Sequence, residues 1–173
     1  MNWNLAMTNS IVEKIYEHAI TASDKKAIIA FDNELTYSEL WYRISRFSKY
    51  LRMRGVRKGD CVLVQTAYTT SFLVSWFAVH LAGAIFVPID KSASSEYVNK
   101  IQKTTNAGFL LFCGQKDIKA DCEEICFDEA VMTNTSLDNT NVSLPRMEQS
   151  ADIVFTTGTT GEAKGVEIQH GAL

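Results

Sequence analysis

The stretch Ile153-Val-Phe-Thr-Thr-Gly-Thr-Thr-Gly-Glu-Ala-Lys-Gly-Val166 is the most informative part of this 173-residue chain. It begins in a predominantly apolar run, residues 151–155, which predicts a buried strand, and apolar residues alternate again from Val166 onward. Residues 156–162 between them are four Thr, two Gly and one Glu, and Lys164 follows. Small residues let backbone N–H groups converge, hydroxyl groups add donors, and a lysine adds positive charge. The stretch therefore favours binding of the oxygens of a polyphosphate.

Two better-known phosphate-binding loops do not match this stretch. A Walker A loop requires Gly-Lys followed by Ser or Thr, whereas Lys164 stands between Ala163 and Gly165. Gly158-Thr-Thr-Gly161 is not the Gly-x-Gly-x-x-Gly fingerprint of dinucleotide-binding folds either. A flexible hairpin connector remains as the alternative interpretation. Against it, seven consecutive small or polar residues exceed what a hairpin turn needs, and Thr prefers strands to turns.

Thr156-Thr-Gly-Thr-Thr-Gly-Glu-Ala-Lys-Gly165 resembles the phosphate-binding signature of the AMP-forming adenylate enzymes. This family comprises the acyl- and aryl-CoA synthetases, the adenylation domains of peptide synthetases, and the luciferases. Its usual form reads Ser/Thr-Ser-Gly-Thr-Thr-Gly-x-Pro-Lys-Gly-Val. The chain departs from it at Thr157, where serine is common, and at Ala163, where proline is common. Thr keeps the hydroxyl group and the loss of proline only loosens the loop, so neither departure removes the chemistry.

Three earlier segments also resemble this family and occur in the expected order: Leu35-Thr-Tyr-Ser-Glu-Leu40, Lys58-Gly-Asp-Cys-Val62 and Leu81-Ala-Gly-Ala-Ile-Phe-Val-Pro-Ile-Asp90. The resemblance thus spans roughly residues 35–170. It implies an α/β fold with a mostly parallel sheet and flanking helices, the opening part of the large N-terminal domain of an adenylate-forming enzyme. Residues 1–173 would then be a single partial AMP-binding domain, with the C-terminal remainder of the family fold absent.

The resemblance implies a two-step reaction. ATP and a carboxylic acid give an acyl-adenylate and pyrophosphate, and the acyl group then passes to a thiol acceptor, coenzyme A or phosphopantetheine. The residues that it places around ATP are Thr156, Thr157, Gly158, Thr159, Thr160, Gly161 and Lys164. Thr156 is equally explained as the last residue of the strand. Mg²⁺ is expected for the family, but its protein ligand, the ribose-binding aspartate and the C-terminal lysine come later in the family than this chain extends.

We therefore expect no catalytic residue within the chain and no adenylation by the 173-residue chain alone. An acyl-CoA synthetase is preferred slightly over a peptide-synthetase adenylation domain, because no carrier or condensation module precedes residue 1. A non-catalytic phosphate-binding or interaction domain is the further alternative. A truncated parallel sheet leaves an apolar edge or face uncovered, so self-association is also expected.

Composition excludes several classes of partner. Seventeen basic and twenty acidic residues give a net charge of −3 without a polybasic run, which argues against a nucleic-acid partner. The N-terminus lacks the layout of a signal peptide, and four cysteines without such a signal fit a reducing cytoplasm. Cys122 and Cys126 have no second Cys or His pair to complete a zinc site.

The segment from Cys61 to Ile89 carries no charged residue, which raises the question of a membrane span. Its polar residues interrupt the apolar run that a spanning helix of about 20 residues needs. A buried βαβ unit explains the missing charges better, with strands at residues 61–66 and 85–89 and a helix at about 70–82.

Local signals predict the remaining elements. Ser10–Glu13 and Thr36–Glu39 have the spacing of capping boxes and begin two helices, the second with an apolar stripe of Leu40, Ile44, Phe47 and Leu51. Residues 27–31 and 34–36 are predicted to be the strands of a small hairpin. A further helix is expected at residues 94–105, strands at 108–113 and 124–127, and a polar loop at 133–150 that leads into the phosphate-binding stretch. The three histidines, His18, His80 and His170, are scattered in the sequence and are interpreted as packing or solvated residues.

Overall fold

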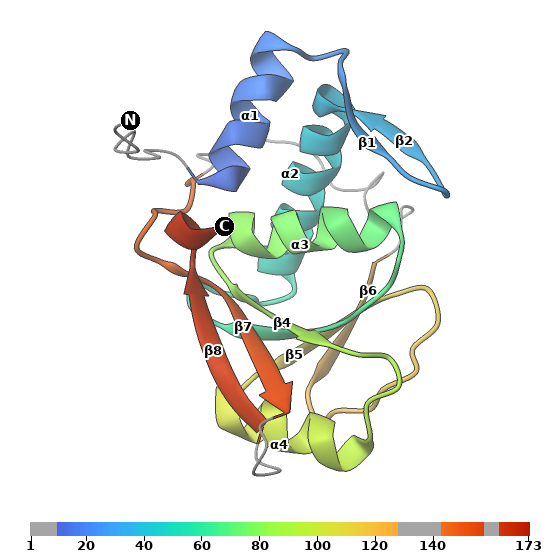
Figure 1. The fold of residues 1–173 in the computed structure, drawn as a ribbon, viewed down its shortest axis with the longest axis vertical. Helices are drawn as coiled ribbons and strands as arrows, with labels where there is room; N and C mark the ends of the chain where they lie inside the picture. The colour runs from blue at the N-terminus through green and yellow to red at the C-terminus, as the bar shows by residue number, and fades with distance from the viewer. Residues whose placement is uncertain (1–9, 128–142, 158–162) are drawn as a thin grey trace.

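The computed structural model describes residues 10–127, 143–157 and 163–173. A six-stranded sheet in the order β6-β5-β3-β4-β7-β8 forms the centre of the molecule, with helices on both faces (Figure 1). Its strands are β3 (Cys61–Gln65), β4 (Ile85–Ile89), β5 (Phe109–Cys113), β6 (Glu123–Phe127), β7 (Ser150–Thr157) and β8 (Ala163–Gln169). All neighbouring strands pair in parallel except β7 and β8, which pair antiparallel. The prediction of an α/β fold with a mostly parallel sheet is therefore confirmed.

The helices begin at the capping residues that the sequence indicates. They are α1 (Ile11–Thr21), α2 (Tyr37–Met53), α3 (Thr70–Ala82) and α4 (Ser95–Thr105), and the chain ends in a short 3₁₀ helix, η1 (His170–Ala172). At α2 both halves of the capping box form: Glu39 N donates to Thr36 Oγ1 at 3.3 Å, and Thr36 N donates to Glu39 Oε2 at 2.8 Å. At α1 the Ser10 side chain accepts a hydrogen bond from Glu13 N.

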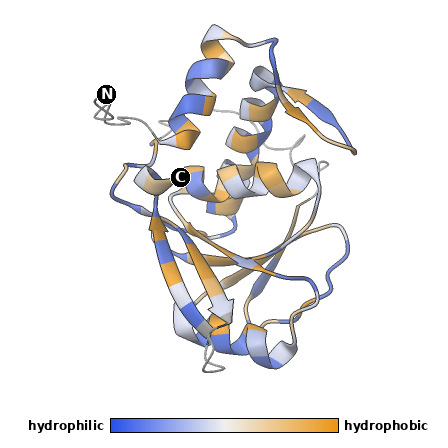
Figure 2. Cartoon of the chain, in the orientation of Figure 1, coloured by the Kyte–Doolittle hydropathy of each residue, from blue (hydrophilic) through white to orange (hydrophobic). Residues whose placement is uncertain are grey.

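Two apolar clusters fill the two faces of the sheet. On one face, the predicted stripe of α2, namely Leu40, Ile44, Phe47 and Leu51, is buried against α1, α3 and the sheet. On the other face, Val98 and Ile101 of α4 pack on Leu63 and Leu110. Because side chains alternate along a strand, Val62 and Val64 face the first cluster while Leu63 faces the second. Figure 2 shows the resulting distribution of hydrophobic residues over strands and helices.

Helix α3 is buried on nearly every side, which explains the absence of charge between residues 61 and 89. It lies between α2 and the sheet, and β3, α3 and β4 form the predicted βαβ unit. None of the helices among the described residues is long and apolar enough to cross a membrane. The helix ends at Gly83, whose φ of 81° is a left-handed conformation that favours glycine.

A small antiparallel hairpin, β1 (Lys26–Ile29) and β2 (Glu34–Thr36), lies outside the main sheet. The predicted first strand extended to Phe31, but the strand ends at Ile29, and Phe31 is fully exposed beside the turn. The turn is fastened to α3 by Asp32, which accepts hydrogen bonds from Thr70 N and Thr70 Oγ1, both at 2.9 Å.

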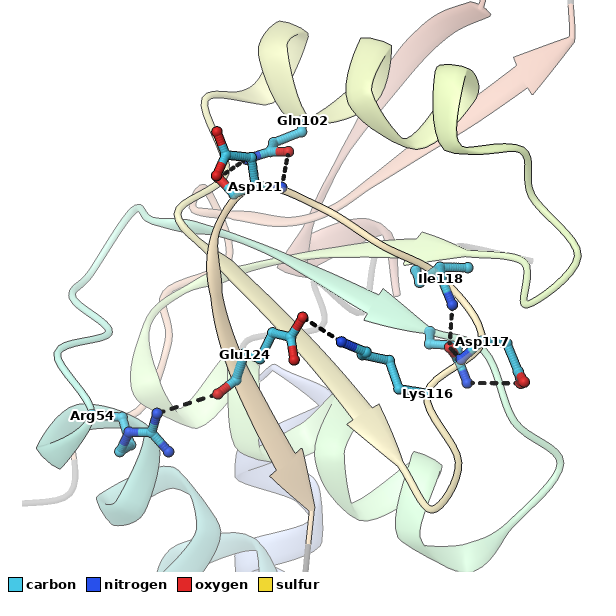
Figure 3. A network of polar contacts seen from close by, with 8 residues as sticks. Arg54, Gln102, Lys116, Asp117, Ile118, Asp121 and Glu124 are labelled. Carbon is cyan, nitrogen blue, oxygen red and sulfur yellow. Dashed lines mark hydrogen bonds and ion pairs between the residues drawn. The ribbon is translucent and has the colours of Figure 1, made fainter.

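Polar contacts hold the outer strand β6 and the loop before it (Figure 3). Arg54 at the end of α2 donates to the carbonyl oxygen of Glu124 at 3.2 Å, and Lys116 Nζ lies 2.5 Å from Glu124 Oε1. The buried amide of Gln65 accepts from Asp117 N at 2.7 Å and from Ile118 N at 3.2 Å. These two hydrogen bonds hold the loop between β5 and β6 against the end of β3.

The four cysteines are free thiols. Burial raises the pKa of Cys113 to about 11, and burial with two acidic neighbours raises the pKa of Cys122 to about 11. Among the described residues no group of three or more His, Cys, Asp and Glu side chains is arranged to hold a metal ion. Most of the predicted polar loop at 133–150 lies outside the described residues, which resume with an irregular segment and a turn before β7.

Candidate phosphate-binding hairpin

The strand–loop–strand stretch forms the antiparallel hairpin of β7 and β8. Thr156 pairs with Lys164 and Thr157 pairs with Ala163. The predicted site residues Thr156 and Thr157 are therefore the last two positions of β7, and Lys164 is the second position of β8. The loop is therefore shorter than the seven residues read from the sequence, because two threonines belong to β7. The other four predicted site residues lie outside the described residues: Gly158, Thr159, Thr160 and Gly161.

Lys164 and Thr156 lie on the same face of the hairpin, since directly paired residues of antiparallel strands point to the same side. Side chains alternate along β7, which places Thr156 on the same face as Val154 and Asp152. Both Thr156 and Lys164 are exposed, and Lys164 has no ion-pair partner among the described residues. The ammonium group is thus open to an anion at the end of the hairpin.

The opposite face of the hairpin packs against the α4 side of the sheet. Ile153 and Phe155 contact the cluster around Leu63 and Val98. Gly165 pairs with Phe155, and a Cβ atom on Gly165 would lie 3.1 Å from Phe155 Cζ and 3.2 Å from Ile153 Cγ2. The glycine of the Lys-Gly pair thus lets the Phe155 ring lie against β8.

At the other end of the hairpin, a charged side chain that the sequence analysis did not single out is buried. Asp152 is the one charged residue in the run 151–155, and it is 6% exposed. Its Oδ1 accepts a hydrogen bond from Trp76 Nε1 at 3.1 Å and lies 2.9 Å from His80 Nε2. Trp76 and His80 are one turn apart on the same face of α3. The two side chains together compensate much of the cost of burying a carboxylate.

His170 completes this cluster from the end of β8. Its ring lies 4.8 Å from the His80 ring at 82°, in an edge-to-face arrangement. Burial, with a smaller contribution from His80, lowers the pKa of His170 from 6.5 to about 4, and Asp152 opposes this shift. Both rings are buried, in agreement with the interpretation of His80 and His170 as packing residues, and the fold brings them together across 90 positions of sequence. His18, by contrast, is exposed on α1 beside Tyr37, as expected.

The sequence does contain one signal that could have pointed to this cluster, Asp152 itself, because a carboxylate inside a buried strand needs a partner. No sequence rule identified Trp76 and His80 as that partner, since 72 positions separate His80 from Asp152. The hairpin thus carries a cation and a hydroxyl group at its far end, and a buried polar cluster at its near end.

Comparison with known protein families agrees with this geometry. The family described as AMP-binding enzyme matches residues 15–173. The chain belongs to the AMP-binding enzyme family. Two curated relatives are nonribosomal peptide synthetases: GRA1 of Gibberella zeae is 30% identical over 166 residues, covering 93% of this chain and 2% of the relative. Nonribosomal peptide synthetase 8 of Aspergillus fumigatus is 32% identical over 171 residues, covering 94% of this chain and 2% of the relative.

Solved structures of AMP-binding enzymes share the fold. The Klebsiella oxytoca NpsA N-terminal subdomain, solved in complex with 3-hydroxybenzoyl-AMSN, superposes with a TM-score of 0.83 at 20% identity, covering 98% of this chain and 43% of that chain. The nonribosomal peptide synthetase FmoA3, in its AMPPNP-bound form, superposes with a TM-score of 0.78 at 23% identity, covering 95% and 18%. These neighbours confirm the predicted fold, and this chain covers less than half of each of them.

The chain spans a small part of its relatives, from 2% of GRA1 to 14% of the phenyloxazoline synthase MbtB of Mycobacterium sp.. The prediction of an AMP-forming family is confirmed by these matches. The slight preference for an acyl-CoA synthetase is not supported, because these relatives favour the peptide-synthetase alternative. The preference for an acyl-CoA synthetase had relied on the absence of a carrier or condensation module before residue 1. This absence carries no information, because the chain covers only a small part of its relatives.

Proposed function

We propose that this chain is the front part of an adenylation domain of the peptide-synthetase type. Such a domain joins the α-phosphate of ATP to the carboxylate of an amino acid and releases pyrophosphate, and the aminoacyl group then passes to a phosphopantetheine thiol. The observation that carries the proposal is the strand register, which sets Lys164 opposite Thr156 where the Thr/Gly loop begins and ends. The Lys164 side chain is exposed and has no ion-pair partner within the described ranges. Membership of the AMP-binding enzyme family supports it.

Within this proposal the hairpin binds the β- and γ-phosphates. N–H and O–H groups of Thr157, Gly158, Thr159, Thr160 and Gly161 donate to phosphate oxygens. The Lys164 ammonium group stabilises negative charge as pyrophosphate leaves, and Thr156 adds a hydroxyl group on the same face. Mg²⁺ would neutralise part of the phosphate charge, and its protein ligand is proposed to lie outside this chain.

The proposal treats residues 1–173 as a single partial domain, with the polar segment 133–150 leading into the hairpin. In support, the superposition with the NpsA N-terminal subdomain includes 98% of this chain but only 43% of that chain. Phosphate donors without the adenine, ribose and carboxylate contacts of a complete domain give weak binding and no alignment of the acid. We therefore expect the 173-residue chain to bind pyrophosphate without forming an adenylate.

Two assays test these points. Isothermal titration of the chain with pyrophosphate should give binding that weakens with salt and falls at least severalfold in Lys164→Ala, because one ion pair is removed. Lys58→Ala removes a lysine elsewhere on the molecule and serves as the matched control. Equal binding by wild type and Lys164→Ala would refute the role of this lysine.

The second assay is carboxylate-dependent ATP–pyrophosphate exchange with amino acids, aryl acids and fatty acids as separate sets. The 173-residue chain should give no exchange, and detectable exchange would contradict the proposed inactivity. In the natural protein that contains this chain, exchange with amino acids supports the peptide-synthetase type. Exchange with fatty acids alone, followed by transfer to coenzyme A, would restore the acyl-CoA synthetase alternative.

Self-association of the chain is part of the same proposal. Strand β8 is an outer strand of the described sheet, and Val166 on it is 52% exposed beside the open face of the hairpin. The backbone N–H and C=O groups along the open edge of an outer strand are a template for pairing with another chain. Light scattering should show dimers or larger species that increase with concentration, and a monomer at all concentrations would refute this part.

A further inference from the structure

In the described residues, the hairpin β7–β8 is joined to the main sheet by a single backbone pair. In the described residues, the register between β4 and β7 consists of the pair Phe86 and Asp152, whereas the register between β7 and β8 continues to Thr157. Beyond Asp152 the hairpin is therefore an arm that continues past its backbone attachment (Figure 1). Its orientation depends on the packing of Ile153 and Phe155 on one face and on what holds Asp152 on the other.

The side chain of Asp152 fastens this position to a second element. Trp76 and His80 both direct a ring nitrogen at the same carboxylate oxygen, at 3.1 and 2.9 Å. An ionised carboxylate only accepts hydrogen bonds, so His80 Nε2 carries the proton of this contact. Two donors on one rigid helix restrict both the position and the direction of the carboxylate. The backbone pair with β4 and the two hydrogen bonds to α3 thus coincide at one residue.

The return strand is held at the same level. His170 N donates to the carbonyl oxygen of Gln149 at 2.9 Å, and the His170 ring packs edge-to-face on His80. His170 is 3% exposed and His80 is completely buried. The Nδ1 atoms of both rings are buried without a hydrogen-bond partner among the described residues. Burying these two nitrogens without partners costs free energy, which apolar side chains at the two positions would avoid. Apolar side chains, however, could not form a directional hydrogen bond with Asp152.

The far half of the arm has less support on its α3 face. Val154 and Val166 pair there, and Val166 is about half exposed. At about 3.3 Å per residue, Thr156 lies about 13 Å along β7 from Asp152, so a rotation of about 10° at Asp152 would move it by about 2 Å. Displacements of about 1 Å are enough to spoil the alignment of reacting groups. A small change at the attachment thus becomes a large one at Lys164.

We propose that Asp152, held by Trp76 and His80, is a positioning residue that orients the phosphate-binding hairpin on the sheet. This inference rests on the proposed function for its consequence, binding of phosphate, but its structural part is independent of it. Asp152 touches no phosphate and acts through the hairpin. Lys164, by contrast, lies next to the loop and is proposed to contact phosphate directly.

Hydrogen exchange of the arm tests the structural part. In Asp152→Ala, the protected backbone amides of residues 154–156 and 164–168 should exchange about tenfold faster, because the hydrogen bonds to α3 are lost. Asp152→Asn keeps an oxygen that can accept from both donors, which share Oδ1 in Asp152, and should restore most of the protection. Trp76→Phe removes one donor and should have an intermediate effect.

Asp32→Ala is the matched control, because Asp32 fastens the other hairpin to the start of α3 through two hydrogen bonds. It should leave exchange in β7 and β8 unchanged. Unchanged exchange in Asp152→Ala, or an equal increase in Asp32→Ala, overturns the inference.

Titration with pyrophosphate, at a temperature where circular dichroism shows every variant folded, tests the consequence. Asp152→Ala should bind at least threefold more weakly than wild type, with recovery in Asp152→Asn and no change in Asp32→Ala. Equal affinity of wild type and Asp152→Ala refutes positioning, because a residue that only stabilises the fold leaves the affinity of the folded chain unchanged. If wild type does not bind pyrophosphate, the proposed function of the loop fails, and the exchange rates still decide whether Asp152 orients the arm.

Discussion

Acidification should destabilise the chain through His170. The buried ring has a pKa of about 4 in the folded chain, against 6.5 for an ordinary histidine, because burial disfavours the charged form. Between these two values the unfolded chain binds more protons at this position than the folded chain. The free energy of unfolding therefore decreases as pH falls from 6.5 to 4, and the contribution of His170 is constant above and below this window.

The magnitude follows from the difference of about 2.5 pKa units, at about 1.36 kcal/mol per unit. The complete loss is about 3 kcal/mol, and about 2.5 kcal/mol of it is reached between pH 7.5 and 4.5. A loss of this size is a large fraction of the stability of an ordinary domain, which is about 5–15 kcal/mol. It should be visible as a shift of the urea midpoint.

The assay is urea unfolding followed by tryptophan fluorescence at several pH values between 4.5 and 7.5. Carboxylates such as Asp32, whose pKa is lowered by hydrogen bonds from Thr70, also reduce the free energy of unfolding when they are protonated at low pH. The comparison is therefore between wild type and His170→Gln, which should lose about 2.5 kcal/mol less over this range. His18→Gln removes an exposed histidine and should follow the wild-type curve. Parallel curves for wild type and His170→Gln, or an NMR titration of His170 near 6.5, would refute the reasoning.

Three further predictions concern the described residues. Gly165→Ala should cost about 1–3 kcal/mol in urea unfolding because the new Cβ displaces the Phe155 ring, and unchanged stability would mean that the ring adapts freely. Iodoacetamide at pH 7.5 should modify the exposed Cys126 well before Cys113, whose pKa is about 11, and mass mapping in the reverse order would contradict this. Gln65→Met should cost about 1–3 kcal/mol because two backbone N–H groups lose their acceptor, and a cost below about 0.5 kcal/mol would mean that they find another.

Local signals were sufficient to predict the elements of the fold. The capping side chains at Ser10, Thr36 and Ser94 each accept a hydrogen bond at the start of a helix, which is a short-range interaction that sequence spacing records. The βαβ unit was predicted because a helix buried on nearly every side has no place for charge. Strand ends were displaced by a residue or two because they depend on the neighbouring strand, as at Ile29.

Residues of the hairpin that are close in the sequence could be placed together from the sequence, whereas residues that are distant in the sequence could not. The chemistry of Lys164 and the threonines is contained in one continuous stretch, so the sequence was enough to place them together. Asp152 and His80 come together only when β7 enters the sheet beside β4 and α3 covers it. The pattern of apolar residues gave the strand and the helix but not the side chains that meet between them.

The separation between the loop and the Asp152 cluster has a physical reason. A loop of glycine and threonine lets backbone N–H groups converge on an anion, but small side chains cannot hold that loop against other parts of the protein. The two strands fix where the loop begins, and the arm they form is oriented at its base by a buried carboxylate with two donors. Removing either donor leaves a charge poorly compensated in a buried place, so the anchored arrangement is favoured strongly over a rotated one. The groups proposed to bind phosphate and the side chains proposed to orient them thus belong to different residues of the same hairpin.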